Sequence, residues 1–191
     1  MRKIFVLIAC FNFLLFFGCT KSSSSSLVHD DMVCKQLEGA WQQSLLVETE
    51  ISLNPDNPAE VSGTVKSNSV TTLTFADNQA FSIDTKIEFL SYEPNDPTDK
   101  TPLPLEAMKD YFSQKISVKG MFIATESVIQ YDHRLVTLND STEIPFEEFA
   151  ASNPEAGTQI QTAAWRLEGD SLYFSVDGSN TQTELVYTRV K

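Results

Sequence analysis

Hydrophobic and polar positions alternate along most of the chain after residue 39. The clearest run is 79–92, where Phe81, Ile83, Ile87 and Phe89 alternate with polar and charged residues. A period of two is typical of a β-strand that buries one face. The same alternation, bounded by turn-forming residues, predicts eight strands: 40–52, 69–76, 79–92, 116–125, 127–138, 158–168, 171–176 and 183–190.

Short turns join several of these strands in sequence. Asp77-Asn78 and Gly169-Asp170 each stand between two apolar runs. Antiparallel strands joined in order form an up-and-down barrel, which removes the exposed edges of an open sheet. We therefore predict an all-β fold, an eight-stranded antiparallel up-and-down barrel with one or two short helices. A β-sandwich is the alternative.

Three segments lack the two-residue period. Residues 29–37 predict one or two helical turns before the first strand. Residues 102–114 predict a helix of about three turns, which either covers one barrel mouth or packs on the outside. Residues 145–151 predict a single turn. Segment 60–66 is ambiguous and is interpreted as an excursion at a sheet edge.

The first strand opens with Gly39-Ala40-Trp41. Gly39 allows a sharp bend, and Trp41 brings a large apolar side chain to one end of the core. This pattern resembles the Gly-x-Trp signature of lipocalin and lipocalin-like domains, which belong to the calycins. The resemblance implies that Trp41 plugs the closed end of the barrel and that Arg189, in the last strand, stacks across it by a cation–π contact.

The front of the chain has the pattern of a secretory signal peptide. Two basic residues precede an apolar run that ends at Phe17, followed by Gly18-Cys19. A small residue before cysteine resembles the lipobox of bacterial lipoproteins, which implies acylation of Cys19. We predict a signal peptide at 1–18, a lipidated cysteine with a serine-rich tether at 19–29 and the barrel domain at 30–191. The alternative is a plain secreted protein cut nearby.

The lipobox resemblance also implies a location. Acyl chains on Cys19 would anchor the protein in a bacterial membrane, and the uncharged Thr20 after the cysteine favours the outer membrane over the inner one. The anchored domain would face the periplasm or the outside. After loss of the signal peptide and lipidation of Cys19, Cys34 is the sole remaining cysteine, so no internal disulfide is expected.

The net charge of the chain limits the kinds of partner that it can bind. The chain has 14 basic and 26 acidic residues and a formal net charge of −12. Such a surface repels nucleic acid, so no nucleic-acid partner is expected. The sequence therefore directs attention to small molecules and envelope proteins.

Catalytic patterns are scarce. The chain has two histidines, His29 and His133, and has no paired-histidine zinc pattern, nucleophile elbow or glycine-rich phosphate loop. We expect a non-enzyme with no metal and no cofactor. On the predicted strand, Tyr131 and His133 share one face while Asp132 and Arg134 share the other, where they most simply form a solvated ion pair.

The barrel interior is the remaining candidate site. Aromatic and aliphatic residues that the alternation places inward could line a small-ligand cavity or fill a core. We predict binding of a small hydrophobic ligand there, with a filled barrel that contacts an envelope protein as the alternative. The predicted lining residues are Phe75, Phe81, Ile87, Phe89, Phe122, Tyr131, Trp165 and Phe174.

Overall fold

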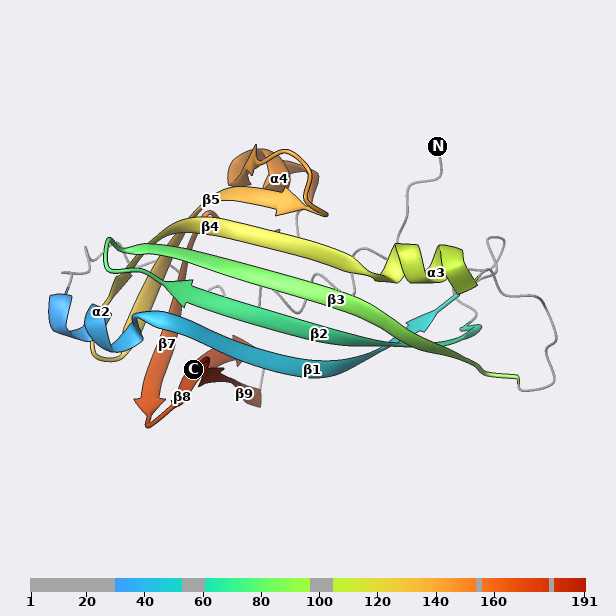
Figure 1. Cartoon of the computed structure of the whole chain (residues 1–191), viewed down its shortest axis with the longest axis horizontal. Coiled ribbons are helices and arrows are strands. Elements are labelled where there is room, and N and C mark those ends of the chain that lie inside the picture. Colours follow the sequence, from blue (N-terminus) through green and yellow to red (C-terminus); the bar gives the residue numbers. More distant parts are fainter. Residues whose placement is uncertain (1–29, 53–60, 97–104, 154–155, 179–180) are drawn as a thin grey trace.

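The computed structural model describes residues 30–52, 61–96, 105–153, 156–178 and 181–191 (Figure 1). The predicted lipid-attachment residue Cys19 and the predicted signal peptide lie outside the described residues. No helix in the described ranges is long and apolar enough to cross a membrane.

The described residues form a closed antiparallel barrel of eight strands. In the sheet order β4-β3-β2-β1-β9-β8-β7-β5, each strand pairs with its neighbours, and a β4–β5 ladder closes the ring. The predicted up-and-down barrel is therefore confirmed, and the sandwich alternative is wrong. The eight strands are β1 (Gly39–Ile51), β2 (Gly63–Phe75), β3 (Ala80–Pro94), β4 (Gln114–Ala124), β5 (Val128–Leu138), β7 (Ile160–Glu168), β8 (Ser171–Gly178) and β9 (Thr181–Arg189).

Four short elements complete the described fold. A two-residue strand, β6 (Ile144–Pro145), pairs with the end of β5. The other three elements are helices. Figure 1 shows α2 and α3 at opposite ends of the wall that the long strands β1 to β4 form. These helices are α2 (Asp31–Leu37), α3 (Leu105–Phe112) and α4 (Phe146–Ser152).

Strand β2 is longer than the sequence predicts. It begins at Gly63, so much of the ambiguous segment 60–66 belongs to this strand and not to an edge excursion. Its inward-facing residues after Val65 are Ser67 and Ser69, which are buried. Because polar residues occupy both faces here, the alternation of apolar and polar residues disappears from the sequence.

The helices close the two ends of the barrel. Asp30 caps α2 by accepting hydrogen bonds from the backbone N–H groups of Met32 and Val33, at 2.9 and 3.3 Å. Helix α3 buries Met108 and Phe112. These two side chains pack with inward-facing residues of β1 and β2, so α3 covers the mouth opposite α2.

Two separate clusters of buried apolar residues form the core. The larger one extends from α2 and Trp41 through the barrel to α4. The smaller one lies under α3 and consists of Ile51, Val65, Met108 and Phe112. Between the two clusters, the inner face of β2 carries small polar side chains, and the neighbouring Ile87 of β3 is buried without belonging to either cluster.

Candidate functional site

The closed end of the barrel is built around Trp41. Its side chain is fully buried, and its indole Nε1 donates a hydrogen bond to the Leu37 carbonyl at 2.8 Å. The guanidinium carbon of Arg189 lies 4.1 Å from the centre of the Trp41 ring. Trp41 and Arg189 are also partners in the β1–β9 ladder, so the stacking implied by the family resemblance is present.

Gly39 makes room for this arrangement. Its φ of +115° lies in a region that side chains disfavour. A Cβ atom at residue 39 would lie 3.3 Å from Nη1 of Arg189. Glycine is therefore needed both for the bend into β1 and for the approach of the guanidinium group.

The predicted lining residues lie inside the barrel. Seven are buried, and Phe89 is half-buried against Phe112 in the smaller cluster. An aromatic group crosses the larger cluster, with ring centres 4.9 Å apart for Phe75 and Phe122 and 5.0 Å apart for Phe81 and Tyr131. These residues therefore form much of the inner wall, and their role as ligand contacts stays a prediction.

A belt of small hydroxyl side chains separates the two apolar clusters. We define this hydroxyl belt as Ser67, Ser69, Thr71 and Thr85, on the inner faces of β2 and β3. Ser67, Ser69 and Thr85 are buried, and the hydroxyl oxygens of Thr71 and Thr85 are 3.0 Å apart. Sequence reasoning missed this belt for two reasons. The predicted second strand began at residue 69 and left out Ser67, and only apolar and aromatic residues were taken as inward-facing, which passed over Ser69, Thr71 and Thr85.

Residues 131–134 lie on β5, which places alternate side chains on opposite faces of the sheet, as predicted. Asp132 and Arg134 form an exposed ion pair with an Oδ2–Nε distance of 2.9 Å. His133 is buried between Phe81 and Phe146, with Nδ1 3.1 Å from the Gln159 carbonyl. Burial lowers the pKa of His133 to about 4, so the ring is neutral at pH 7.

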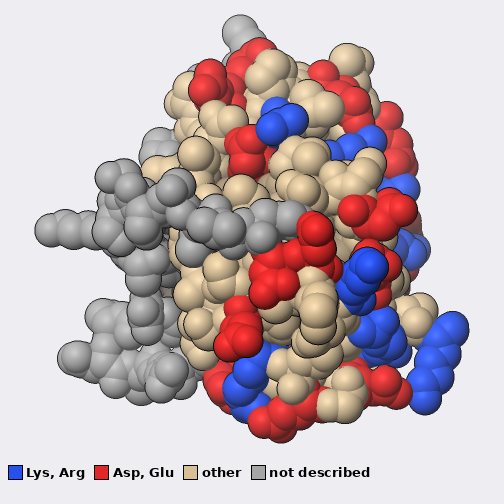
Figure 2. Space-filling view, turned by 90° about the vertical axis from the view of Figure 1, so that its left-hand side faces the viewer, with Lys and Arg blue, Asp and Glu red and all other residues tan. Residues whose placement is uncertain are grey.

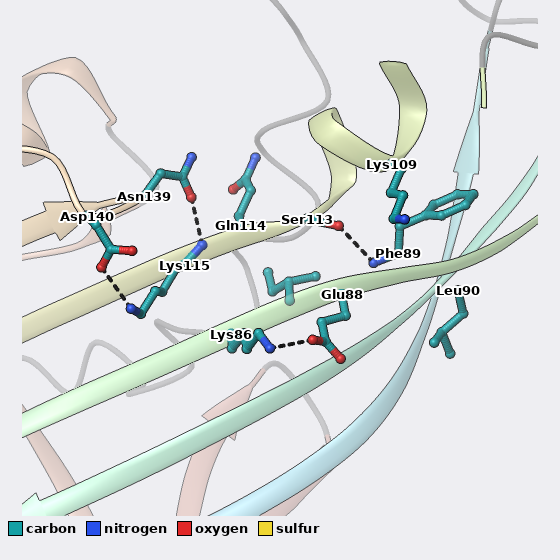
Figure 3. Close-up of a pocket in the computed structure, with 11 residues that line it drawn as sticks. Lys86, Glu88, Phe89, Leu90, Lys109, Ser113, Gln114, Lys115, Asn139 and Asp140 are labelled. Atoms are coloured by element: carbon teal, nitrogen blue, oxygen red, sulfur yellow. Dashed lines mark hydrogen bonds and ion pairs between the residues drawn. The ribbon is translucent and has the colours of Figure 1, made fainter. Parts of the chain in front are cut away.

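A second feature, which the sequence did not predict, is a pocket of about 390 Å³ at the rim near α3 (Figure 3). We call it the rim pocket. Residues 86–90 of β3 form one wall, and 113–115, at the start of β4, form another. Lys109 of α3 and the turn residues Asn139 and Asp140 complete it. Because these segments are distant in sequence, no local motif could have indicated the pocket.

The rim pocket contrasts with the opposite end of the barrel. Figure 2 shows acidic and basic side chains interspersed at the end that carries α2. Three lysines, Lys86, Lys109 and Lys115, and two acidic residues, Glu88 and Asp140, line the rim pocket. For a chain of net charge −12, this is a local excess of one positive group.

The described residues were also considered for a metal site and for a reactive cysteine. The described residues contain no group of three His, Cys, Asp or Glu side chains that could hold a metal ion. Cys34 is one of the buried residues of α2, and burial raises the pKa of its thiol, which disfavours the reactive thiolate.

The barrel is consistent with a calycin-like fold. A scan against protein-family models finds no match for this chain, and a search of curated proteins finds no similar sequence.

Proposed function

We propose that this protein is a lipocalin-like lipoprotein that holds a small apolar ligand inside its barrel and catalyses no reaction. The observation that carries the proposal is the hydroxyl belt. Bulky side chains just fill an eight-stranded barrel, so small ones at mid-height leave space for one small molecule. The apolar clusters on both sides would contact the ligand's apolar body.

The hydroxyl belt also indicates the polarity of the ligand. Ser67, Ser69 and Thr85 offer buried hydroxyl groups between the two apolar clusters. Buried polar groups favour ligands that satisfy their hydrogen bonds. A mainly apolar molecule with a single uncharged polar group fits this interior best.

Binding of N-phenyl-1-naphthylamine, an uncharged fluorescent probe with one N–H group, tests this proposal. Every described strand and helix lies between residues 31 and 191, so the chain from residue 20 onward carries the whole described barrel. We expect saturable one-to-one binding to this chain. We expect Ser69→Leu to weaken binding at least tenfold, because the larger side chain occupies the belt.

The matched control is Ser44→Leu. Ser44 is exposed on the outer face of β1, where its hydroxyl donates to Oδ1 of Asn68 at 3.0 Å. Its replacement should leave probe binding unchanged. If Ser69→Leu unfolds the barrel, as judged by circular dichroism, Ser67→Val replaces it. No binding to the wild-type chain, or equal binding by the folded belt variant, would contradict the proposal and favour a filled barrel that contacts an envelope protein.

The anchoring part of the proposal has its own test. We propose that acyl chains on Cys19 hold the domain on the outer membrane, with the serine-rich tether separating it from the lipid surface. In the native host, Cys19→Ser should stop incorporation of labelled palmitate and move the protein to the soluble fraction. Unchanged labelling would exclude Cys19 as the lipidated residue.

A further inference from the structure

The rim pocket lies where strand β3 extends beyond the first residue of strand β4. The ladder between these strands ends at the pair Ile87 and Gln114, while β3 continues to Pro94. Helix α3 and the turn after β5 flank the gap that this mismatch leaves (Figure 3). The volume of about 390 Å³ falls in the range of about 300–1,000 Å³ typical of small-molecule sites.

The charges of the rim pocket do not cancel. Lys86 is paired with Glu88, and Lys115 Nζ lies 2.8 Å from Asp140 Oδ1. Lys109 has no ion-pair partner in the described part of the chain, and Figure 3 shows it reaching from α3 toward Phe89. The pocket therefore carries one uncompensated positive charge, which favours a monoanion.

The neutral polar groups of the pocket favour the same kind of ligand. The Ser113 hydroxyl oxygen accepts a hydrogen bond from the Phe89 N–H at 3.2 Å, which leaves the hydroxyl proton available for donation. The Asn139 amide oxygen accepts from the Lys115 N–H at 2.8 Å, which leaves the amide NH₂ as a donor. The oxygens of Ser113 and Asn139 are thus engaged within the protein, while their donor groups are available to an anion.

The turn that carries Asn139 is held in place. Asn139 and Asp140 have φ values of 48° and 56°, in the left-handed region that Asn and Asp tolerate better than most residues. The Asn139 N–H donates to the Lys115 carbonyl at 2.7 Å, and the Ser141 N–H donates to the Leu138 carbonyl at 2.9 Å. This wall is therefore preorganised against β4, which lowers the entropic cost of binding.

The β3 side of the pocket carries three apolar side chains beside the Lys86–Glu88 ion pair. Ile87, Phe89 and Leu90 line it, and 54% of Leu90 is exposed to solvent. A simple inorganic anion would leave this surface in water. A molecule with an apolar ring or chain beside its anionic group would cover it.

We propose that the rim pocket is a second binding site, at the gap where β3 extends beyond β4, for a small organic monoanion with an apolar body. Lys109 contacts the anionic group, Ser113 and Asn139 donate hydrogen bonds to it, and Phe89 and Leu90 cover the apolar part. Phe89 also belongs to the predicted interior lining, whereas Lys109 and Asn139 line the rim pocket alone, so these two residues distinguish the two sites.

A matched pair of probes tests the rim pocket. 1-Anilinonaphthalene-8-sulfonate has the ring system of N-phenyl-1-naphthylamine plus one sulfonate group. We expect Lys109→Gln to weaken sulfonate-probe binding about tenfold, as expected for loss of a charge-assisted contact, and to leave binding of the uncharged probe unchanged. Lys35→Gln, in the last turn of α2 at the other end of the barrel, is the control and should change neither affinity.

Two further measurements locate the sulfonate probe. The side-chain NH₂ signal of Asn139 in a ¹H–¹⁵N NMR spectrum should shift on titration with this probe. The interior variant Ser69→Leu should retain that shift. The proposal is overturned if Lys109→Gln leaves the affinity for the sulfonate probe unchanged, if both probes weaken in parallel, or if Asn139 does not shift.

Discussion

The guanidinium group of Arg189 lies flat over Trp41 and also holds the helix that precedes it. Its carbon is 4.1 Å from the Trp41 ring centre, while Nη1 and Nη2 donate to the carbonyls of Glu38 and Gln36, each at 2.8 Å. A residue two positions from the end of the chain thus joins the first strand to α2. The two carbonyls belong to the C-terminal part of this helix, where backbone acceptors lack helical partners.

Replacement of Arg189 should therefore loosen the closed end. We expect Arg189→Ala to lower the free energy of unfolding by roughly 2–4 kcal/mol, because it removes a cation–π contact and two charge-assisted hydrogen bonds. Arg189→Lys should lose about 1–2 kcal/mol, since it keeps the charge but loses the planar fork. Urea denaturation measures both values.

Arg166 provides the control for this prediction. Its guanidinium carbon is 3.7 Å from the Tyr173 ring centre, and it pairs with Glu184 on the exposed outer face of the barrel. Arg166→Ala should leave the denaturation midpoint within error of the wild type. Equal losses for the two variants would mean that the contacts of Arg189 with α2 contribute nothing.

Gly39 should resist substitution more strongly than another glycine with positive φ. Gly39→Ala is expected to cost about 2 kcal/mol or more, because it combines an unfavourable φ of +115° with crowding of Arg189. Gly169, with φ of +59°, has no atom within 4 Å of an added Cβ. Gly169→Ala should cost only about 1 kcal/mol. Thermal unfolding compares them, and the reverse order would contradict the crowding argument.

His133 should make the barrel sensitive to mild acid. Its pKa falls from 6.5 to about 4 on folding because the ring is buried. The unfolded chain therefore binds a proton between pH 6.5 and 4 that the folded barrel does not. The free energy of unfolding should fall by about 3 kcal/mol as the pH drops through this window, then receive no further contribution from His133 below about pH 4.

His133→Asn isolates this contribution. The amide keeps a polar group near the position of Nδ1, which lies 3.1 Å from the Gln159 carbonyl. The variant should lose stability uniformly with pH and show a shallower decline between pH 6.5 and 4 than the wild type. Parallel pH profiles of unfolding for the two proteins would show that His133 does not titrate in this window.

The strands and the closed end could be predicted because their signals are local. Alternation along 79–92 reflects a wall with one apolar and one wet face, and Gly39 and Trp41 lie within three residues of each other. Even the distant Arg189 could be assigned through a known pairing of first and last strands. The sequence by itself therefore determined the barrel, its strand order and the residues that close it.

Only the tertiary structure decided which side chains line the interior and the mouth of the barrel. The start of β2, before residue 69, was missed because Ser67 is polar yet faces inward, which is visible only once both neighbouring strands are in place. In the helix before β4, Leu105 is exposed, and only Met108 and Phe112 reach the barrel mouth.

The rim pocket depends on the same kind of information. Lys109 and Asn139 are 30 positions apart in sequence, and the length mismatch of β3 and β4 brings them to one gap. Alternation records which face of a strand is buried, since neighbouring residues share one backbone. It does not record where one strand ends relative to the next, because the register and the packing of the whole barrel set that position.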